Sequence, residues 1–432
     1  MKMLNAELIK QLASQRAKIE CFSISLIQNK KSGPLEFEGP GCIFFDEDKT
    51  LKIKMYSNKT SSSPGMFNFF FGNELGVVPD DRYFTVSARD DNGNSWTNNR
   101  IYLNDGVHLG VHGTTLDFEV ENLSYTKSIN KSAAFNGAVI IPGTFKLPYT
   151  DYFDMPDGAR SLNRLTIDDG ARSYTITQKD AVFEIEIIDS TQSIEIDQAF
   201  YLVEGLGIAI GRLMEPALII LTGGDKYTVF IRSAKPKEYE PISSPIVKLR
   251  YNEPNELFSF LKSYVRKRSA THSHLVNYWH RLNEIPLLNT EAAALILCVN
   301  IEGMIKNYFS HGRTIETNII DEIELTKKEL KTLKLPDHIK SHLGNFLSSI
   351  KKPSISSILS CLADEKKIDA AHASSWKNLR HVLAHADNSI SEPAKFEQFV
   401  IDLHNCLSLF NDLIRQSIES HEDRQETLAE KK

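Results

Sequence analysis

The sequence predicts an α+β protein with a β-rich N-terminal part and an all-helical C-terminal part. Over the first 240 residues the apolar positions mostly alternate with polar ones, whereas from about residue 254 they recur every three or four residues. The length of 432 residues favours two domains over one. We therefore expect an antiparallel sheet or sandwich with one helix over 1–240, and a helical bundle over 241–432.

Several N-terminal segments have the alternation of half-buried strands. These segments are 50–57, 116–125 and 181–190. Residues 82–105 predict a hairpin, because Asn92 and Gly93 form a favoured two-residue turn. The segment "GPLEFEGPGC" (33–42) predicts a loop on its Gly and Pro content.

The end of the N-terminal part predicts a helix followed by a second hairpin. The helix covers about 193–214, and the hairpin is expected to turn at Gly223-Gly224. The stretch "GLGIAIG" (205–211) resembles a dinucleotide fingerprint, but its third glycine comes one residue late and the preceding segment is helical. Close helix packing explains these glycines better.

A proline-rich, charged linker over 233–256 marks the boundary between the two parts. Helical periodicity follows it to the end of the chain, and residues after about 420 predict a polar tail. The expected helices are 255–268, 272–284, 289–309, 317–333, 336–350, 354–365, 368–386 and 393–420.

Composition excludes several classes of protein. The net charge is −6, shared unevenly: residues from 241 onward carry 25 Lys+Arg and 24 Asp+Glu, so the excess of acid lies in the first 240. The chain is therefore not a basic nucleic-acid coat, although its C-terminal part could accept a polyanion at a local patch. The sequence contains no run of 18 apolar residues, so we expect no membrane-spanning helix. Its start lacks the continuous apolar stretch of a signal peptide, so we expect no export. Five scattered cysteines without a CxxC motif indicate a reducing cytoplasm and no zinc knuckle.

The segment "WKNLRHVLAHAD" (376–387) places Arg380, His381 and His385 on one predicted helix. A zinc protease would need HExxH, but Val382 stands where the glutamate should be. Metal binding by His381 and His385 alone has no third ligand in view, and no GxSxG or catalytic-cysteine motif is found. A helix with two surface histidines and a surface arginine is the plainest interpretation. Trp376, Leu379, Val382 and Leu383 then form its packing stripe.

A fourth interpretation is metal-independent cleavage of RNA. That reaction needs a group that moves protons near neutral pH, which suits histidine, and a fixed cation on the phosphate, which suits arginine. Arg380 and His385 supply both groups. They are five positions apart, or about 140° around an ideal helix, so they do not share one face.

These residues resemble the R-x4-H signature of HEPN domains, small helical modules found in many ribonucleases. A tryptophan one turn before the arginine, a long amphipathic helix after it and an apolar helix bearing "NIEGMIKNYF" fit the same family. Glu302 on that apolar helix matches an acidic residue that faces the site in many HEPN proteins. The β-rich N-terminal half, with "EFEGPGCIFFDEDKTLKIKMYS" (36–57), resembles that of ApeA-type bacterial antiphage proteins.

The resemblance implies a metal-independent endoribonuclease without a cofactor, cleaving tRNA or another host RNA. Arg380 would hold the scissile phosphate, His385 would be the acid and base, and His381 would orient the RNA. Glu302, Asn378 and Lys377 would support them. HEPN ribonucleases usually dimerise, so the homodimer would build each cleft from two helices, while the N-terminal half would sense a phage protein or restrain the nuclease. Two alternatives stay open: a non-catalytic HEPN-like module that binds a nucleotide, RNA or protein, and a ligand-binding β domain with a structural helical tail.

Overall fold

The computed structural model describes residues 4–419 with internal gaps. The gaps are 58, 61–77, 104–105, 111–112, 155–159, 169–171, 180, 191–192, 235–244, 248, 250–253, 271–274, 283–284, 286–287, 311–316, 351–352 and 386–391. The chain forms two compact units. One contains Met1–Leu206, Met214–Glu238 and Leu249–Phe258; the other contains Gly207–Leu213, Tyr239–Lys248 and Ser259–Lys432. The predicted linker falls mostly in the gaps.

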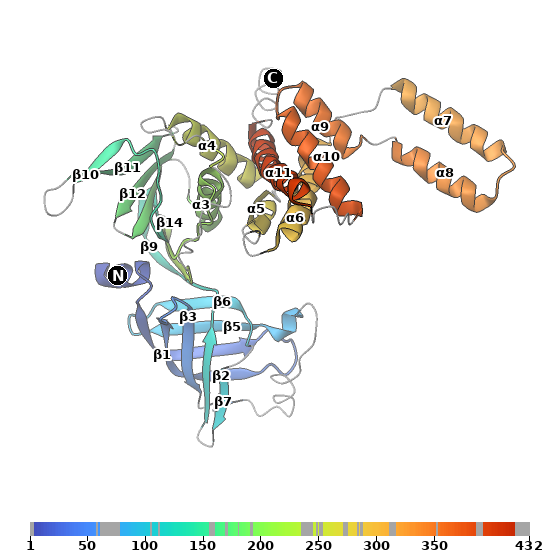
Figure 1. The fold of residues 1–432 in the computed structure, drawn as a ribbon. Helices are drawn as coiled ribbons and strands as arrows, with labels where there is room; N and C mark the ends of the chain where they lie inside the picture. Colours follow the sequence, from blue (N-terminus) through green and yellow to red (C-terminus); the bar gives the residue numbers. More distant parts are fainter. Residues whose placement is uncertain are drawn as a thin grey trace. The chain divides into compact units, whose positions relative to one another are not determined.

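The first unit is built on one antiparallel sheet (Figure 1). Its strands are β1 (Lys18–Gln28), β2 (Glu36–Phe45), β3 (Leu51–Ser57), β4 (Lys59–Thr60), β5 (Phe84–Asp90), β6 (Ser95–Ile101), β7 (Val107–Gly110), β8 (Gly113–Glu119), β9 (Asn122–Pro142), β10 (Asp151–Asp154), β11 (Arg160–Asp168), β12 (Arg172–Lys179), β13 (Val182–Asp189) and β14 (Leu218–Arg232). Their order is β10-β11-β12-β13-β9-β6-β5-β1-β2-β3-β8-β7, with β14 also on β9 and β4 on β2. The predicted β-rich N-terminal part is confirmed.

In the described part of this unit the helical segments beside the sheet are α1 (Ala6–Ala13), the 3-10 turn η1 (Asp80–Arg82) and α3 (Ile196–Ile210). The predicted helix at 193–214 is confirmed as α3. Inward-facing residues of β1, β2, β3, β5 and β8 form one apolar core, as the alternating burial of β3 and β5 shows. This alternation is the pattern from which the strands were expected.

The hairpin predicted at Asn92-Gly93 is confirmed, and it joins β5 to β6. Gly93 has φ of +76°, which the turn requires and glycine adopts without strain. The buried Asp90 carboxylate accepts hydrogen bonds from the backbone N–H groups of Asn92 and Asn94 and from the indole N–H of Trp96. The turn is therefore fixed by a side chain as well as by the glycine.

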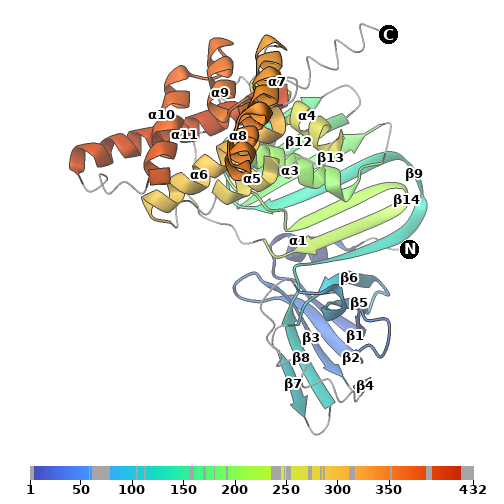
Figure 2. The ribbon, with the colours of Figure 1, turned by 90° about the vertical axis from the view of Figure 1, so that its right-hand side faces the viewer.

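The second predicted hairpin, at Gly223-Gly224, is wrong. Residues 218–232 form one long strand, β14, that pairs with β9 along its length, with register shifts at Thr222–Gly224 and Gly224–Lys226. Figure 2 shows the two strands running side by side as a curved pair. Gly224 has φ of +60°, so the glycines make a bulge in a continuous strand rather than a reversal of the chain.

The loop predicted at 33–42 is also wrong over most of its length, because β2 begins at Glu36. Added Cβ atoms at Gly39 and Gly41 would lie 2.0 and 2.1 Å from backbone carbonyl oxygens of β3. The glycines thus permit a close approach of two strands, which is a use of glycine within a sheet.

The second unit is helical, as predicted. Its helices are α4 (Asn255–Ala270), α5 (Leu275–Leu282), α6 (Thr290–Met304) with a π-helical turn η3 (Ile305–Phe309), α7 (Thr317–Thr332), α8 (Asp337–Ile350), α9 (Ile355–Asp364), α10 (Ala370–His385) and α11 (Pro393–Glu419). Its core lies where α6, α10 and α11 pack together, with α5 on α6 and α9 on α10 (Figure 1).

Helix α6 is central to this bundle. The segment Thr290–Phe309 is the only helix in the described part that has the length and mean hydropathy, 1.2, of a membrane span, and half of it is buried in the protein. Asn289 caps its start by accepting a hydrogen bond from the N–H of Ala292 at 2.8 Å. An added Cβ at Gly303 would lie 2.7 Å from the ring of Tyr278, so α5 packs closely there. These contacts are those of a buried core helix.

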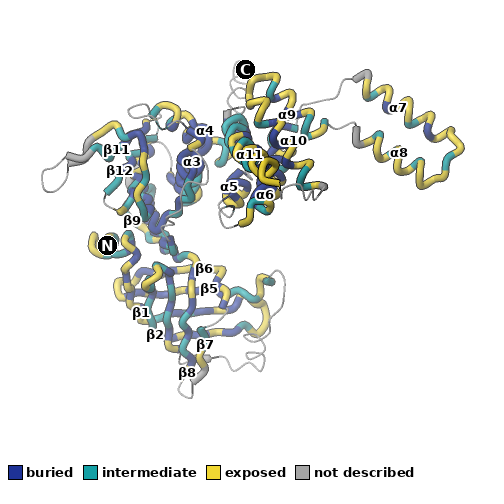
Figure 3. The backbone as a smooth tube through the Cα atoms, viewed as in Figure 1, coloured by how far each residue is buried: buried dark blue, intermediate teal, exposed yellow. Residues whose placement is uncertain are grey.

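Helices α7 and α8 differ from the rest of the bundle, because they pack mainly on each other. Among their described residues only Ile323 and Leu330 are buried, and Figure 3 shows both helices as largely exposed. The stripe Ile339, Leu343 and Phe346 of α8 is exposed by 37%, 40% and 63%.

Candidate active site

Helix α10 carries five of the six residues predicted for the site. Asp369 begins it by accepting a hydrogen bond from the N–H of Ala371 at 2.7 Å. Trp376 and Leu379 are 4% and 1% exposed and fix the helix in the core, whereas Val382 and Leu383 are only half-buried. The polar residues between these anchors are thereby held at defined positions on the two flanks of the helix.

On the flank toward α6, Arg380 pairs with Glu302. The Nε atom of Arg380 donates a hydrogen bond to Oε1 of Glu302 at 2.7 Å. The arginine side chain stays 46% exposed, while that of Glu302 is 21% exposed. The structure thus brings together an arginine and a glutamate that are 78 positions apart in sequence. A cation is thus held by one carboxylate on a side chain that is about half exposed.

A second cation lies near the same carboxylate. Lys306, one helical turn after Glu302, approaches its Oε2 at 3.8 Å. Glu302 is also directly followed by the close packing at Gly303 and then by the π-helical turn η3. Such turns are frequent at functional sites. Two positive side chains therefore border a single acidic one on this flank.

The thiol of Cys298, one turn before Glu302 on α6, is buried. Burial raises its pKa to about 12, with Arg380 acting to lower the pKa and Glu302 to raise it. Burial also raises the pKa of Cys406 on α11. A raised pKa disfavours the thiolate form of both thiols.

On the flank toward α11, α10 borders a pocket of about 360 Å³. Its lining consists of residues of α10 and α11: Lys377, Asn378, Leu379, His381, Val382, Lys395, Gln398, Phe399 and Asp402. Three predicted site residues, Lys377, Asn378 and His381, therefore gather at this pocket. Arg380 is not among the lining residues, so the predicted site is divided between two flanks of one helix.

A buried carboxylate organises the pocket wall. Asp402 is 5% exposed and accepts hydrogen bonds from the amide N–H groups of Asn378 at 3.4 Å and Gln398 at 3.3 Å. Phe399, on the same helix, is 4% exposed and supplies apolar surface. With both amide nitrogens directed at Asp402, the two side chains keep further hydrogen-bonding groups for a bound molecule.

The remaining predicted residues are placed as follows. Lys377 Nζ lies 3.5 Å from the hydroxyl of Ser360 on α9. His381 is exposed. His385 is the last residue of α10, and its side chain lies outside the described part of the chain. Arg380 and His385 lie on the same helix, five positions apart.

Asp402, Gln398 and Phe399 were not predicted for the site. One signal in the sequence could have found Asp402: it falls between Phe399 and Cys406 on the buried stripe of an amphipathic helix, where a carboxylate must be bonded to be tolerated. Gln398 and Phe399 carry no such signal, because an exposed glutamine and a core phenylalanine are ordinary residues of a helix.

No three His, Cys, Asp or Glu side chains within the described ranges gather as metal ligands would. Comparison of the chain with protein-family models, with curated proteins and with solved structures finds no match.

Proposed function

We propose that this protein is a metal-independent HEPN-type endoribonuclease whose reaction takes place on the exposed flank of α10. The observation that supports the proposal best is the geometry of Arg380. Its Nε atom donates to Glu302 at 2.7 Å while its side chain is 46% exposed, and it lies on the helix that ends in His385. A positioned, permanently charged fork is what a phosphodiester oxygen binds.

In the proposed reaction the 2′-oxygen of one nucleotide attacks the adjacent phosphorus, and the bond from phosphorus to the 5′-oxygen of the next nucleotide breaks. A proton leaves the 2′-hydroxyl and a proton reaches the 5′-oxygen, so the products are a 2′,3′-cyclic phosphate and a 5′-hydroxyl. His385 moves these protons. Arg380 stabilises the negative charge that grows on the phosphate oxygens.

The pocket between α10 and α11 fits beside this reaction as a place for a nucleotide next to the scissile phosphate. Phe399 offers an apolar surface, and Asn378 and Gln398 offer amide groups of the kind that read base edges. Lys377 and His381, at the rim, would contact the backbone of the RNA. In this assignment the arginine flank carries the chemistry and the pocket flank carries recognition.

We further propose that two copies meet through the helical unit, because Arg380 and His385 are about 140° apart on one helix and a facing helix can supply the missing group. The protein would act in the cytoplasm on tRNA or another host RNA, halting growth of an infected bacterium. Its β-rich unit would respond to a phage protein or restrain the nuclease. These assignments rest on the resemblance to HEPN and ApeA-type proteins.

The test is incubation of the purified protein with total bacterial tRNA in excess EDTA, beside the His385→Ala and Arg380→Ala variants. Discrete fragments from the wild type that disappear with both variants are expected. End-group analysis should find 2′,3′-cyclic phosphates. If both folded variants cleave as the wild type does, the proposed site is wrong.

A second candidate is a helical module that binds RNA, a nucleotide or a protein without cleaving it. The observation that favours it is that the Nε atom of Arg380 already donates to Glu302, so a phosphate must compete with a carboxylate for this side chain. This candidate predicts saturable, salt-sensitive RNA binding without product, whether or not His385 is present.

A further inference from the structure

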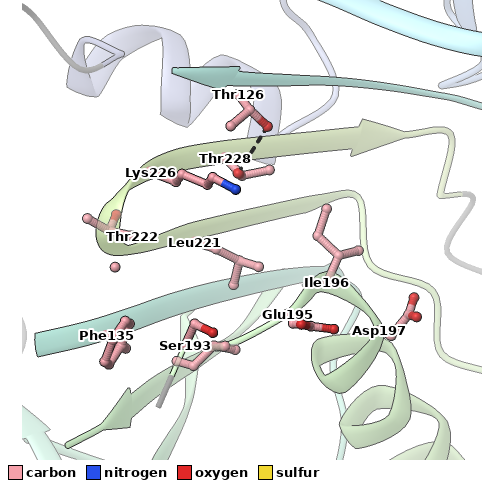
Figure 4. Close-up of a pocket in the computed structure, with 12 residues that line it drawn as sticks. Thr126, Phe135, Ser193, Glu195, Ile196, Asp197, Leu221, Thr222, Lys226 and Thr228 are labelled. Carbon is pink, nitrogen blue, oxygen red and sulfur yellow. Dashed lines mark hydrogen bonds between the residues drawn. The ribbon is translucent and has the colours of Figure 1, made fainter. Parts of the chain in front are cut away.

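The β-rich unit contains a pocket of about 450 Å³ where the bulge of β14, the strand β9 and the start of α3 meet (Figure 4). Its volume lies within the range of small-molecule sites. The described lining consists of side chains from these three elements and the segment before α3: Thr126, Phe135, Ser193, Ile194, Glu195, Ile196, Asp197, Leu221, Thr222, Gly223, Lys226 and Thr228.

The bulge in β14 shapes this pocket. Leu221 and Thr222 are consecutive, yet both line it, because the register shifts after Thr222 and again after Gly224. Gly223 lies against the ring of Phe135, and a Cβ there would be 2.1 Å from Cδ1 of that ring. A glycine is thus required to keep the aromatic ring in the wall. Bulges recur beside functional sites, where they redirect side chains.

Opposite charges line the pocket without meeting. Lys226 comes from β14, Glu195 directly precedes α3, and Asp197 lies in the first turn of α3 (Figure 4). All three side chains are described, and no ion pair within 4.0 Å joins the ammonium group to either carboxylate. Each charge is therefore available to a bound molecule, with the cation and the anions contributed by different elements.

Hydroxyl groups accompany the lysine. The Oγ1 atoms of Thr126 and Thr228 lie 3.1 Å apart across β9 and β14, and one donates to the other. The hydroxyl that accepts this bond keeps its own proton, which it can donate to an acceptor on a ligand. Thr222 adds a third hydroxyl. An anionic group near Lys226 would thus find an ammonium and hydroxyl donors together.

Apart from Ser193, the remaining side chains of the lining are apolar. Phe135 and Ile196 are half-buried and Leu221 is buried, and the three together form the apolar part of the wall. A polyanion such as a nucleotide polyphosphate fits poorly, because two carboxylates face one ammonium. A purely apolar ligand also fits poorly, since it would strip water from three charges and give them no partner.

We propose that this pocket binds a small zwitterion with an apolar body, namely an amino acid or short peptide with an aliphatic or aromatic side chain. Its carboxylate pairs with Lys226 and the hydroxyls of Thr126 and Thr228. Its ammonium pairs with Glu195 and Asp197. Its side chain lies against Phe135, Ile196 and Leu221. Free amino acids and peptides share this chemistry, but peptides have a larger separation between the two charges and add amide groups between them.

The test is calorimetric titration of the full-length protein with leucine, phenylalanine, dileucine and trileucine, each beside its N-acetylated and C-amidated forms. We expect at least one free zwitterion to bind saturably. Blocking either end should weaken it roughly tenfold to a hundredfold, the range for losing one charge-assisted contact. Preference for single amino acids or for peptides would identify the source of the ligand.

Matched variants locate the binding. Lys226→Met should weaken binding of the best ligand as much as amidation of its carboxylate does. The double variant Glu195→Gln, Asp197→Asn should weaken binding as much as acetylation of its amino group does. Lys127→Met, a lysine on β9 outside the lining, and Asp225→Asn, next to Lys226 and also outside it, should leave affinity unchanged. Thermal unfolding of each variant checks the fold. The proposal fails if no unblocked compound binds at millimolar concentration, if blocked compounds bind as well, or if both pocket variants keep wild-type affinity.

Discussion

The two flanks of α10 hold their polar residues in opposite ways. Toward α6, one surface ion pair positions Arg380, whose side chain stays 46% exposed. Toward α11, Asp402 is 5% exposed and its carboxylate accepts hydrogen bonds from two amides in the wall of a pocket. The first arrangement leaves a charge available and contributes little to the fold. In the second arrangement the charge of Asp402 is occupied by hydrogen bonds, which fix the shape of the pocket wall. In the proposed function, the exposed flank of the helix serves the reaction and the buried flank serves recognition.

The largest effect that separates the flanks should come from Arg380→Ala. We expect the rate of tRNA cleavage to fall by about 10²–10³-fold, the usual loss when one preorganised group on a developing anion is removed. The melting temperature should stay within a few degrees, because an exposed ion pair contributes little to stability. Single-turnover kinetics and differential scanning calorimetry measure the two quantities.

Arg380→Lys is the matched control for that variant. It retains the charge but loses the planar fork, so its rate should lie between those of wild type and Arg380→Ala. An alanine variant that is fully active would remove the distinction between the flanks.

The next effect should fall on stability and come from the other flank. Asn378 and Gln398 each donate a hydrogen bond to one oxygen of Asp402. In Asp402→Asn one of these oxygens becomes an NH₂ group, so one of the two amides faces another donor. We expect a loss of about 1–3 kcal/mol in the free energy of unfolding, the cost of an unsatisfied buried group. Urea unfolding followed by tryptophan fluorescence measures it, with Trp279 and Trp376 reporting on the helical unit and Trp96 on the β-rich unit. Glu302→Gln, on the exposed flank, is the comparison and should cost less than about 1 kcal/mol. Equal losses would contradict the contrast.

A smaller effect tests whether Glu302 competes with RNA for Arg380. In a His385→Ala background, where cleavage is expected to stop, Glu302→Gln should tighten RNA binding about fivefold, equivalent to about 1 kcal/mol. The variant removes a negative charge beside the phosphate and frees the Nε donor. Fluorescence anisotropy with labelled tRNA measures the dissociation constant. Weaker RNA binding would mean that Glu302 mainly orients Arg380 for RNA and does not compete with RNA for it.

The sequence predicted the helices of the C-terminal helical unit well, because the apolar residues of each helix recur at helical spacing. Helix α10 was expected at 368–386 and lies at 370–385. The glycines of β2 and β14 misled the prediction, since a glycine in a close strand approach or a bulge looks the same in sequence as one in a loop. The contact between Glu302 and Arg380 could be expected only by resemblance, as no local pattern links positions 78 apart. The pocket at Asp402 depends on how two helices pack, which periodicity does not specify.

The smallest effect concerns the rim of the pocket flank. Lys377 is an exposed cation 3.5 Å from Ser360 and has no acidic partner of its own among the described ion pairs. If it contacts one phosphate, Lys377→Ala should weaken binding of every RNA about equally, by roughly twofold to fivefold near physiological salt, and reduce the slope of log K against log salt by about 0.7–0.9. Its cleavage rate at saturating RNA should stay that of the wild type, because the contact is the same before and during the reaction. Anisotropy titrations at four salt concentrations, with two unrelated tRNAs, measure the slope and its sequence independence. A fall in the saturated rate would instead move Lys377 to the reacting group and join the two flanks into one site.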